Sequence, residues 1–322
     1  MNKISRRTLL QGVGAAATLS ALGTENALAA PQVVTARKGG ATKPRALALI
    51  GDAAHNADGL RVSLGRVFKE ADIPIDFTTN YYDLSASLLK PYRLFICFRD
   101  NRDSMISPGT FGEDGPASAP ETSGADSAGR RAGRAAQVAP LTDVERRNGG
   151  RGDAWISEDQ GKAVKEFVAA GNGFYSYHNN AFVSRSSTNY REVQGGVGLN
   201  HPPLRPYKVR IVNKNHPITR GVEDFMVDDE QHYLIYDKDP KNILLHSENI
   251  DGLRFTSSIR DPKDMSTEPT KDLGTTSVSG WAHEYGSGRV VFTAMGHTIY
   301  TMWQPEHMKL QKNAIRWLLK MN

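Results

Sequence analysis

The sequence is poor in cysteine, with Cys97 alone among 322 residues. One cysteine cannot form a disulfide within the chain, so the fold has to rely on its hydrophobic core. Cys97 lies in the apolar run 94–98, which is typical of a buried strand. Because a reactive thiolate needs an exposed electropositive environment, we predict that Cys97 is an inert core residue.

Long hydrophobic runs and clustered basic residues are also missing. Beyond the first thirty residues no apolar stretch is long enough to cross a membrane, which predicts no stable membrane insertion of the processed chain. The net charge is +5 and the isoelectric point is 9.2. The basic residues are spread along the chain without an aromatic-rich basic module, so we predict a solvated surface and no nucleic-acid partner.

The first residues have the pattern of an export signal. Arg6 and Arg7 precede a short apolar run at 12–22, and Ala27 and Ala29 suit a signal peptidase. We predict a twin-arginine signal peptide at 1–29, cleaved after Ala29, and a linker at 30–44. The twin-arginine machinery would then deliver the protein to the periplasm or the medium. Because this route carries folded proteins, often with an inserted cofactor, it makes a bound divalent metal more plausible.

The rest of the chain alternates between strand and helix patterns. Apolar runs predict strands at 46–50, 73–78 and 94–98, with an amphipathic helix over 59–71 between the first two. Residues 103–153 are rich in Gly, Ala, Ser, Pro and Arg, and they are interpreted as a low-complexity insertion. A capping box at Ser157 opens a helix that leads to a strand at 173–177, and later segments predict strands at 207–212, 243–246 and 288–293 and a final helix from Pro305. This order predicts an α/β fold with a mostly parallel sheet.

The strand at 173–177 ends abruptly in polar side chains. His178, Asn179 and Asn180 follow it directly, in a strand-to-helix elbow that holds neither serine nor cysteine at its tip. In an open α/β sheet, ligands bind beyond the carboxyl ends of the strands. We therefore expect the elbow to form part of a site, together with polar residues that follow other strands.

Several motifs together resemble one known family. They are the elbow 173–178, Tyr190 followed by Gly195-Gly196 and His201-Pro202, the segment His216-Pro217-Ile218-Thr219-Arg220-Gly221, Asp229-Glu230, and Gly286-Ser287-Gly288-Arg289-Val290 leading to Gly296-His297. Their order resembles that of the ThuA-like (trehalose utilisation) proteins, from about Arg45 to Lys320. The resemblance implies a flavodoxin-like three-layer sandwich of the class I glutamine amidotransferase-like type over 45–322. It also implies a link to disaccharide metabolism.

The resemblance implies no thiol chemistry. In the amidotransferase relatives the elbow bears a catalytic cysteine, whereas this sequence has His178 at the matching place. The chain also departs from the family in its insertion after Asp100 and in a first loop that contains His55 where many relatives carry more glycine. These departures leave the substrate undefined.

Three residues are the candidates for chemistry. His178, His297 and Glu230 can move protons, and they can also supply nitrogen and oxygen ligands for a divalent metal with an open position. The alternative interpretations are that His178 and His297 are core residues and that Glu230 is a solvated carboxylate in a loop. We predict that His55, Asn179, Tyr177 and His201 contact substrate. His216 is expected to shape a turn, and four other histidines are expected to serve structure or surface, namely His232, His246, His283 and His307.

These candidates lead to two hypotheses of function. The first is a periplasmic enzyme, a hydrolase or isomerase, that acts on a small-molecule carbohydrate such as a keto-disaccharide or a related glycoside. The second is a non-catalytic sugar-binding or accessory module that keeps the fold without the thiol nucleophile. The sequence by itself leaves both hypotheses open.

Overall fold

The computed structural model describes residues 43–101, 154–252, 254–257 and 271–321, which all belong to one unit spanning Pro31–Asn322. The predicted leader at 1–29, nearly all of the linker at 30–44 and the insertion at 103–153 lie outside the described residues. They stay predictions. Among the described helices, none is both long and apolar enough to cross a membrane.

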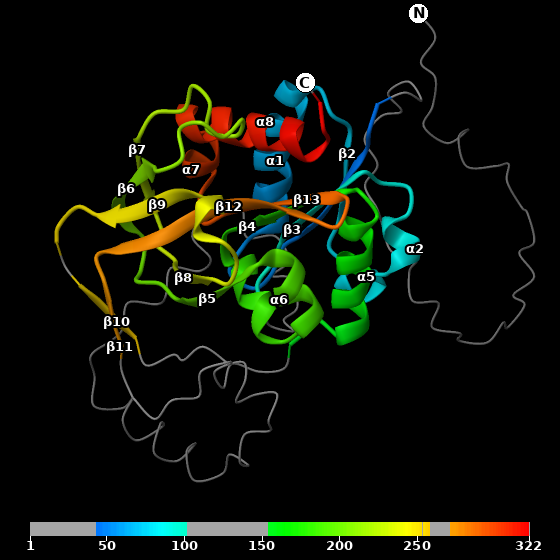
Figure 1. Ribbon diagram of the computed structural model, residues 1–322, viewed down its shortest axis with the longest axis horizontal. Helices are drawn as coiled ribbons and strands as arrows, with labels where there is room; N and C mark the ends of the chain where they lie inside the picture. Colours follow the sequence, from blue (N-terminus) through cyan, green and yellow to red (C-terminus); the bar gives the residue numbers. More distant parts are fainter. Residues whose placement is uncertain (1–42, 102–153, 253, 258–270, 322) are drawn as a thin grey trace, which may run out of the picture. The chain divides into compact units, whose positions relative to one another are not determined.

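A nine-stranded sheet forms the middle of this unit (Figure 1). Its first half is parallel and contains β2 (Ile75–Thr78), β1 (Ala46–Ile50), β3 (Leu94–Phe98), β4 (Gly173–Tyr177) and β13 (Gly288–Thr293), in this spatial order. Numbered along the chain, these five strands run 2-1-3-4-5, which is the flavodoxin-like order. The predicted fold class is confirmed.

The second half of the sheet is antiparallel. It continues from β13 with β12 (Thr276–Tyr285), β9 (Ile243–Asn249), β6 (Arg205–Ile211) and β7 (Phe225–Asp229). The strands predicted at 207–212, 243–246 and 288–293 all join this one sheet. Four successive antiparallel pairings give β7 the same direction as β13, so the carboxyl ends of both strands lie at the same edge.

Helices cover both faces of the parallel half. Alternate residues of β1 point to opposite layers, because side chains alternate along a strand. Ala46, Ala48 and Ile50 pack in one core with α1 (Ala57–Ala71), α7 (Ile299–Trp303) and α8 (Pro305–Leu318). Leu47 and Leu49 pack in the other, on the side of α2 (Ala86–Leu89), α5 (Glu158–Ala169) and α6 (Thr188–Gln194). The result is a three-layer sandwich.

The main helices begin where their caps dictate. The Asn56 side chain accepts hydrogen bonds from the amides of Asp58 and Gly59, so α1 starts two residues before the apolar pattern suggested. Ser157 and Gln160 form the capping box predicted for α5. Placing Asn56 at the cap leaves Gly51 to His55 as a short loop between β1 and α1.

Shorter elements complete the described part. Two-stranded sheets pair β5 (Gly196–Asn200) with β8 (Tyr233–Tyr236), and β10 (Phe255–Ser257) with β11 (Lys271–Gly274). Three 3₁₀ helices are η1 (Tyr81–Asp83), η2 (His178–Arg185) and η3 (Pro240–Asn242). The β5–β8 pair matters for function, because it places the ends of both strands beside the elbow at η2.

Candidate functional site

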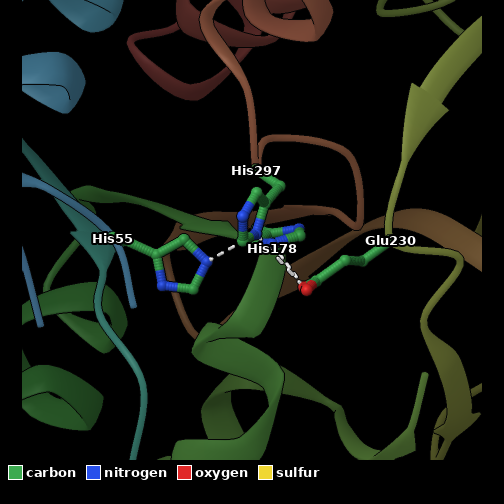
Figure 2. Close-up of side chains that lie close together, drawn as sticks. All are labelled: His55, His178, Glu230 and His297. Carbon is green, nitrogen blue, oxygen red and sulfur yellow. Dashed lines mark hydrogen bonds and ion pairs between the residues drawn. The ribbon is translucent and has the colours of Figure 1, made fainter. Parts of the chain in front are cut away.

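Four side chains from distant parts of the chain meet at the carboxyl edge of the sheet. His55 follows β1, His178 follows β4, Glu230 follows β7 and His297 follows β13. Figure 2 shows the three imidazole rings and the Glu230 carboxylate pointing toward one another. Their nitrogen and oxygen atoms lie within 4.8 Å of one another. We call these four residues the cluster.

The elbow holds His178 in an unusual backbone conformation. Its φ of 52° lies in the left-handed region, which costs a non-glycine residue roughly 1–2 kcal/mol. The ring is fully buried, and its Nδ1 lies 2.7 Å from the carbonyl oxygen of Ala294. A carbonyl only accepts, so Nδ1 carries a proton, and in the neutral ring Nε2 presents a lone pair. That Nε2 atom is buried without a hydrogen-bond partner, and it faces the cluster.

Asp52 orients His55. The Asp52 carboxylate accepts from the His55 ring at Nδ1 (2.9 Å), from the backbone amide of Asp100 (2.8 Å) and from the Asn179 amide (2.9 Å). Both side chains are buried. Burial opposes charge on the His55 ring, but the Asp52 carboxylate outweighs it and raises the pKa of His55 above its ordinary value. The Nε2 atom of His55 lies 3.2 Å from Nδ1 of His297. Asp52 was not among the predicted site residues.

Asp229 links the ends of two strands that lie far apart in the sheet. Three strands separate β7 from β13. The Asp229 carboxylate nevertheless accepts from the backbone amides of Gly296 (2.9 Å) and His297 (3.1 Å). It also accepts from the amide of Glu230 at 2.7 Å. Asp229 therefore fixes the positions of Glu230 and His297 relative to each other.

Glu230 lies at the centre of the histidines. Its Oε2 is 3.3 Å from both His178 Nε2 and His297 Nδ1. Burial disfavours the charged carboxylate, but the imidazoles around it, first His178 and then His232 and His297, hold the pKa of Glu230 well below its ordinary value. Glu230 is thus ionised at neutral pH, and it can accept a proton or bind a cation.

A second pair of histidines touches the same carboxylate. His201 Nδ1 lies 3.6 Å and His232 Nε2 lies 3.7 Å from Glu230 Oε2. The antiparallel register pairs Asn200 with Tyr233, and so brings the residue after β5 opposite the residue before β8. His232 was expected to serve structure or surface, and this pairing turns its buried ring toward Glu230. Burial lowers the pKa of His232 well below its ordinary value.

Two predicted substrate contacts have other surroundings. Tyr177 is fully buried and stacks on Phe98, and its hydroxyl donates to Gln311. This placement, in the core beneath the site, disagrees with the prediction that Tyr177 touches substrate. Asn179 is also buried, and its amide nitrogen donates to Asp52. Asn179 therefore supports the Asp52–His55 pair.

A cavity of about 410 Å³ begins one residue after His201. Its lining comprises Pro202, Pro203, Leu204, Arg205, Pro206, Ile250 and Asp251. Proline and aliphatic surfaces form most of this lining, while Arg205 and Asp251 form an ion pair within it. His201 Nδ1 donates to the carbonyl oxygen of Pro202, the first lining residue, but none of the four cluster residues lines the cavity.

Cys97 and the remaining histidines lie in structural positions. Cys97 is buried, and burial raises the pKa of its thiol to about 12, as expected of an inert core residue. His216 accepts from the amide of Ile218 within a turn. His283 donates to the carbonyl oxygen of Val193, and His307 donates to that of Thr301.

His307 should make the fold sensitive to acid. Burial lowers its pKa from 6.5 to about 4, so the unfolded chain takes up a proton at His307 between pH 6.5 and 4 while the folded protein does not. Stability therefore falls as the pH drops through this range. Urea unfolding of His307→Gln at pH 7 and pH 5 should show an acid-induced loss that is about 2 kcal/mol smaller than in the parent. An equal loss in both proteins would contradict this assignment. Burial also lowers the pKa of half-buried His246, so the comparison variant His246→Gln should reduce the loss by less than His307→Gln does.

The fold and the cluster define an α/β protein of the flavodoxin-like type with a histidine–carboxylate site at the strand ends. A family model described as "ThuA: Trehalose utilisation" matches residues 141–318, more than half of the chain. The protein belongs to this family. Membership suggests a role in trehalose utilisation.

Solved structures show the same fold. One is the crystal structure of a protein from Bacteroides uniformis named as ThuA-like, with a TM-score of 0.52 and 16% identity, covering 87% of this chain and 94% of that one. Another, from Parabacteroides merdae and also named as ThuA-like, has a TM-score of 0.53 and 14% identity, covering 86% and 90%. A comparison with curated protein sequences gives no match.

Proposed function

We propose that this protein is an enzyme that acts on a carbohydrate in sugar catabolism, with a keto-disaccharide or a related glycoside as substrate. The observation that carries the proposal is the position of the Glu230 carboxylate, 3.3 Å from an imidazole nitrogen of both His178 and His297. A buried base beside proton donors is what general acid–base catalysis needs. Trehalose is a disaccharide, and the family description supports this substrate class.

A carbonyl-bearing sugar fits this arrangement chemically. Glu230 would accept a proton from the carbon next to the carbonyl, while an imidazole N–H of the cluster would donate a proton to the carbonyl oxygen. The product of this step is an enediol. Return of the proton from Glu230 to the former carbonyl carbon, with loss of the proton of the other enediol hydroxyl to the imidazole, then isomerises the sugar. In cleavage, the substituent on the carbon beyond the double bond instead leaves with the proton of Glu230, while the enediol hydroxyl returns its proton to the imidazole and the carbonyl forms again.

Variants of the cluster test the proposal. We expect His178→Ala and His297→Ala each to lower kcat/KM for a keto-disaccharide derived from trehalose by about 10²-fold, because each removes one proton-transfer group. His246→Ala is the matched control, since His246 lies on β9 and has no place in the cluster. Chromatography of the reaction products would give the rates. Unchanged turnover in both cluster variants would refute the assignment.

A non-catalytic sugar-binding module is the second candidate. The cavity of about 410 Å³ favours it, because this candidate binding surface contains none of the acid–base groups of the cluster. Calorimetry against the same keto-disaccharide separates the two candidates. Saturable binding by the parent protein without any product formation would establish the module and exclude the enzyme.

A further inference from the structure

We infer that the cluster binds one divalent transition-metal ion, of which Zn²⁺ is the best match. The ligands would be His55 Nε2, His178 Nε2, His297 Nδ1 and Glu230 Oε2. This inference goes beyond the proposed function and concerns the same side chains. A Glu230 carboxylate bound to the ion cannot also accept a proton, so the metal-bound form is distinct from the form that performs the acid–base step. The inferred site differs from the metal site predicted from the sequence, because it includes His55, which had been expected to contact substrate.

Three of the six separations among the four ligand atoms match a tetrahedral ion, and all six are within 4.8 Å. Ligand atoms held about 2.0–2.1 Å from a tetrahedral zinc ion lie roughly 3.3–3.4 Å from one another. The separation of His55 Nε2 and His297 Nδ1 is 3.2 Å. Glu230 Oε2 lies 3.3 Å from His178 Nε2 and from His297 Nδ1. Three separations between different ligand pairs thus agree with the edge of one coordination tetrahedron.

The outer hydrogen bonds point two ring lone pairs inward. The remote nitrogen of His55 is bonded to the Asp52 carboxylate, and that of His178 to the Ala294 carbonyl. Carboxylate and carbonyl partners of this kind hold metal-binding histidines in place and fix their tautomers. The inward Nε2 of His178 is buried and has no hydrogen-bond partner. A cation at the centre would satisfy this atom.

The second pair of histidines lies outside this coordination sphere. His201 and His232 come close to Glu230 Oε2 as a separate set. The His201 Nδ1 atom that approaches the carboxylate donates to the Pro202 carbonyl, so it offers no lone pair to an ion. The geometry therefore supports one metal ion per chain, with His201 and His232 beside the Glu230 carboxylate.

Metal titration of the untagged protein tests the inference. After treatment with a chelator and removal of the chelator, calorimetric titration with Zn²⁺ should show one ion per chain. His55→Ala and the double variant His178→Ala/His297→Ala should lose this binding, and His246→Ala should keep it. Asp52→Asn should keep one site with about 10- to 100-fold weaker affinity, because only the support of His55 changes. Absence of one-ion binding in the parent, or unchanged binding in the cluster variants, would overturn the inference.

Two measurements on the parent protein keep the test valid if a variant does not fold. Added Co²⁺ should give the visible absorption of a four-coordinate ion with nitrogen and oxygen ligands, and six-coordinate absorption would contradict the proposed set. Zn²⁺ should raise the Tm with increasing concentration, because it binds only the folded state. Binding of one ion without sugar turnover would support the metal site and contradict the proposal that the protein is an enzyme. Turnover in a protein that binds no metal would refute the inference alone.

Discussion

Replacing Glu230 by glutamine should lower kcat/KM for the keto-disaccharide by on the order of 10³-fold, the upper part of the range for a catalytic acid or base. Glutamine has nearly the same shape, but its amide carries no charge and cannot accept the transferred proton. The effect should exceed that of either histidine variant, because Glu230 Oε2 is the atom that the histidines of the site share. Initial rates over a range of substrate concentrations would measure it.

A matched control separates this effect from a general loss of charge. Glu248 lies on β9, and its partly exposed carboxylate accepts from Arg210. Glu248→Gln should therefore leave kcat/KM unchanged. A Glu230→Gln protein with rates within tenfold of the parent would show that the carboxylate does not take part in the chemistry.

Replacing Gly288 by alanine should destabilise the protein by about 3 kcal/mol, at the high end for overpacking. A Cβ atom at this position would overlap the carbonyl oxygens of Val168 and Asn172. Both partners are backbone atoms, so neither can move aside by changing a rotamer. Such a loss is a large share of the 5–15 kcal/mol that holds a typical protein folded. The free energy of unfolding in urea would measure it.

Gly65 is the control for this prediction. It lies inside α1, and a Cβ atom there meets nothing within 4 Å. Alanine should therefore raise the free energy of unfolding by about 0.5–1 kcal/mol, because glycine in a helix interior costs that much relative to alanine. If Gly288→Ala proved as stable as the parent, the close packing of β13 against the end of α5 would be refuted.

The sequence predicted the framework of the fold well, because its signals are local. The run 46–50 and the capping box at Ser157 each specify their own element, and the five parallel strands follow from such elements in order. The elbow was also visible, since polar residues follow directly on the apolar strand 173–177. Residues that follow parallel strands share one edge of the sheet, and for this reason His178 and His297 could be expected near each other.

The rest of the site depends on pairings that have no local signal. His232 faces Glu230 because β5 pairs with β8, and the glycine-rich segment 196–200 does not look like a strand. Asp52 becomes recognisable only when its carboxylate is seen to bond the ring of His55. Tyr177 was misjudged because the strand is buried on both faces up to its last residue, so the polar edge begins one position later.

The link made by Asp229 has a consequence for how the site comes into being. Two of the three amides that it binds, those of Gly296 and His297, belong to the last quarter of the chain, whereas the Asp52–His55 pair lies near the beginning of the described part. A fragment that stops before Gly296 lacks these two amides that Asp229 binds, so it cannot position the four side chains of the cluster. The site can therefore form only after the chain has been synthesised beyond His297 and has folded. Conversely, fraying of the outer strand β7 would pull away Glu230 and release the loop of His297 together. A small molecule bound at this site would therefore hold the edge strand β7 against the loop that follows the central strand β13.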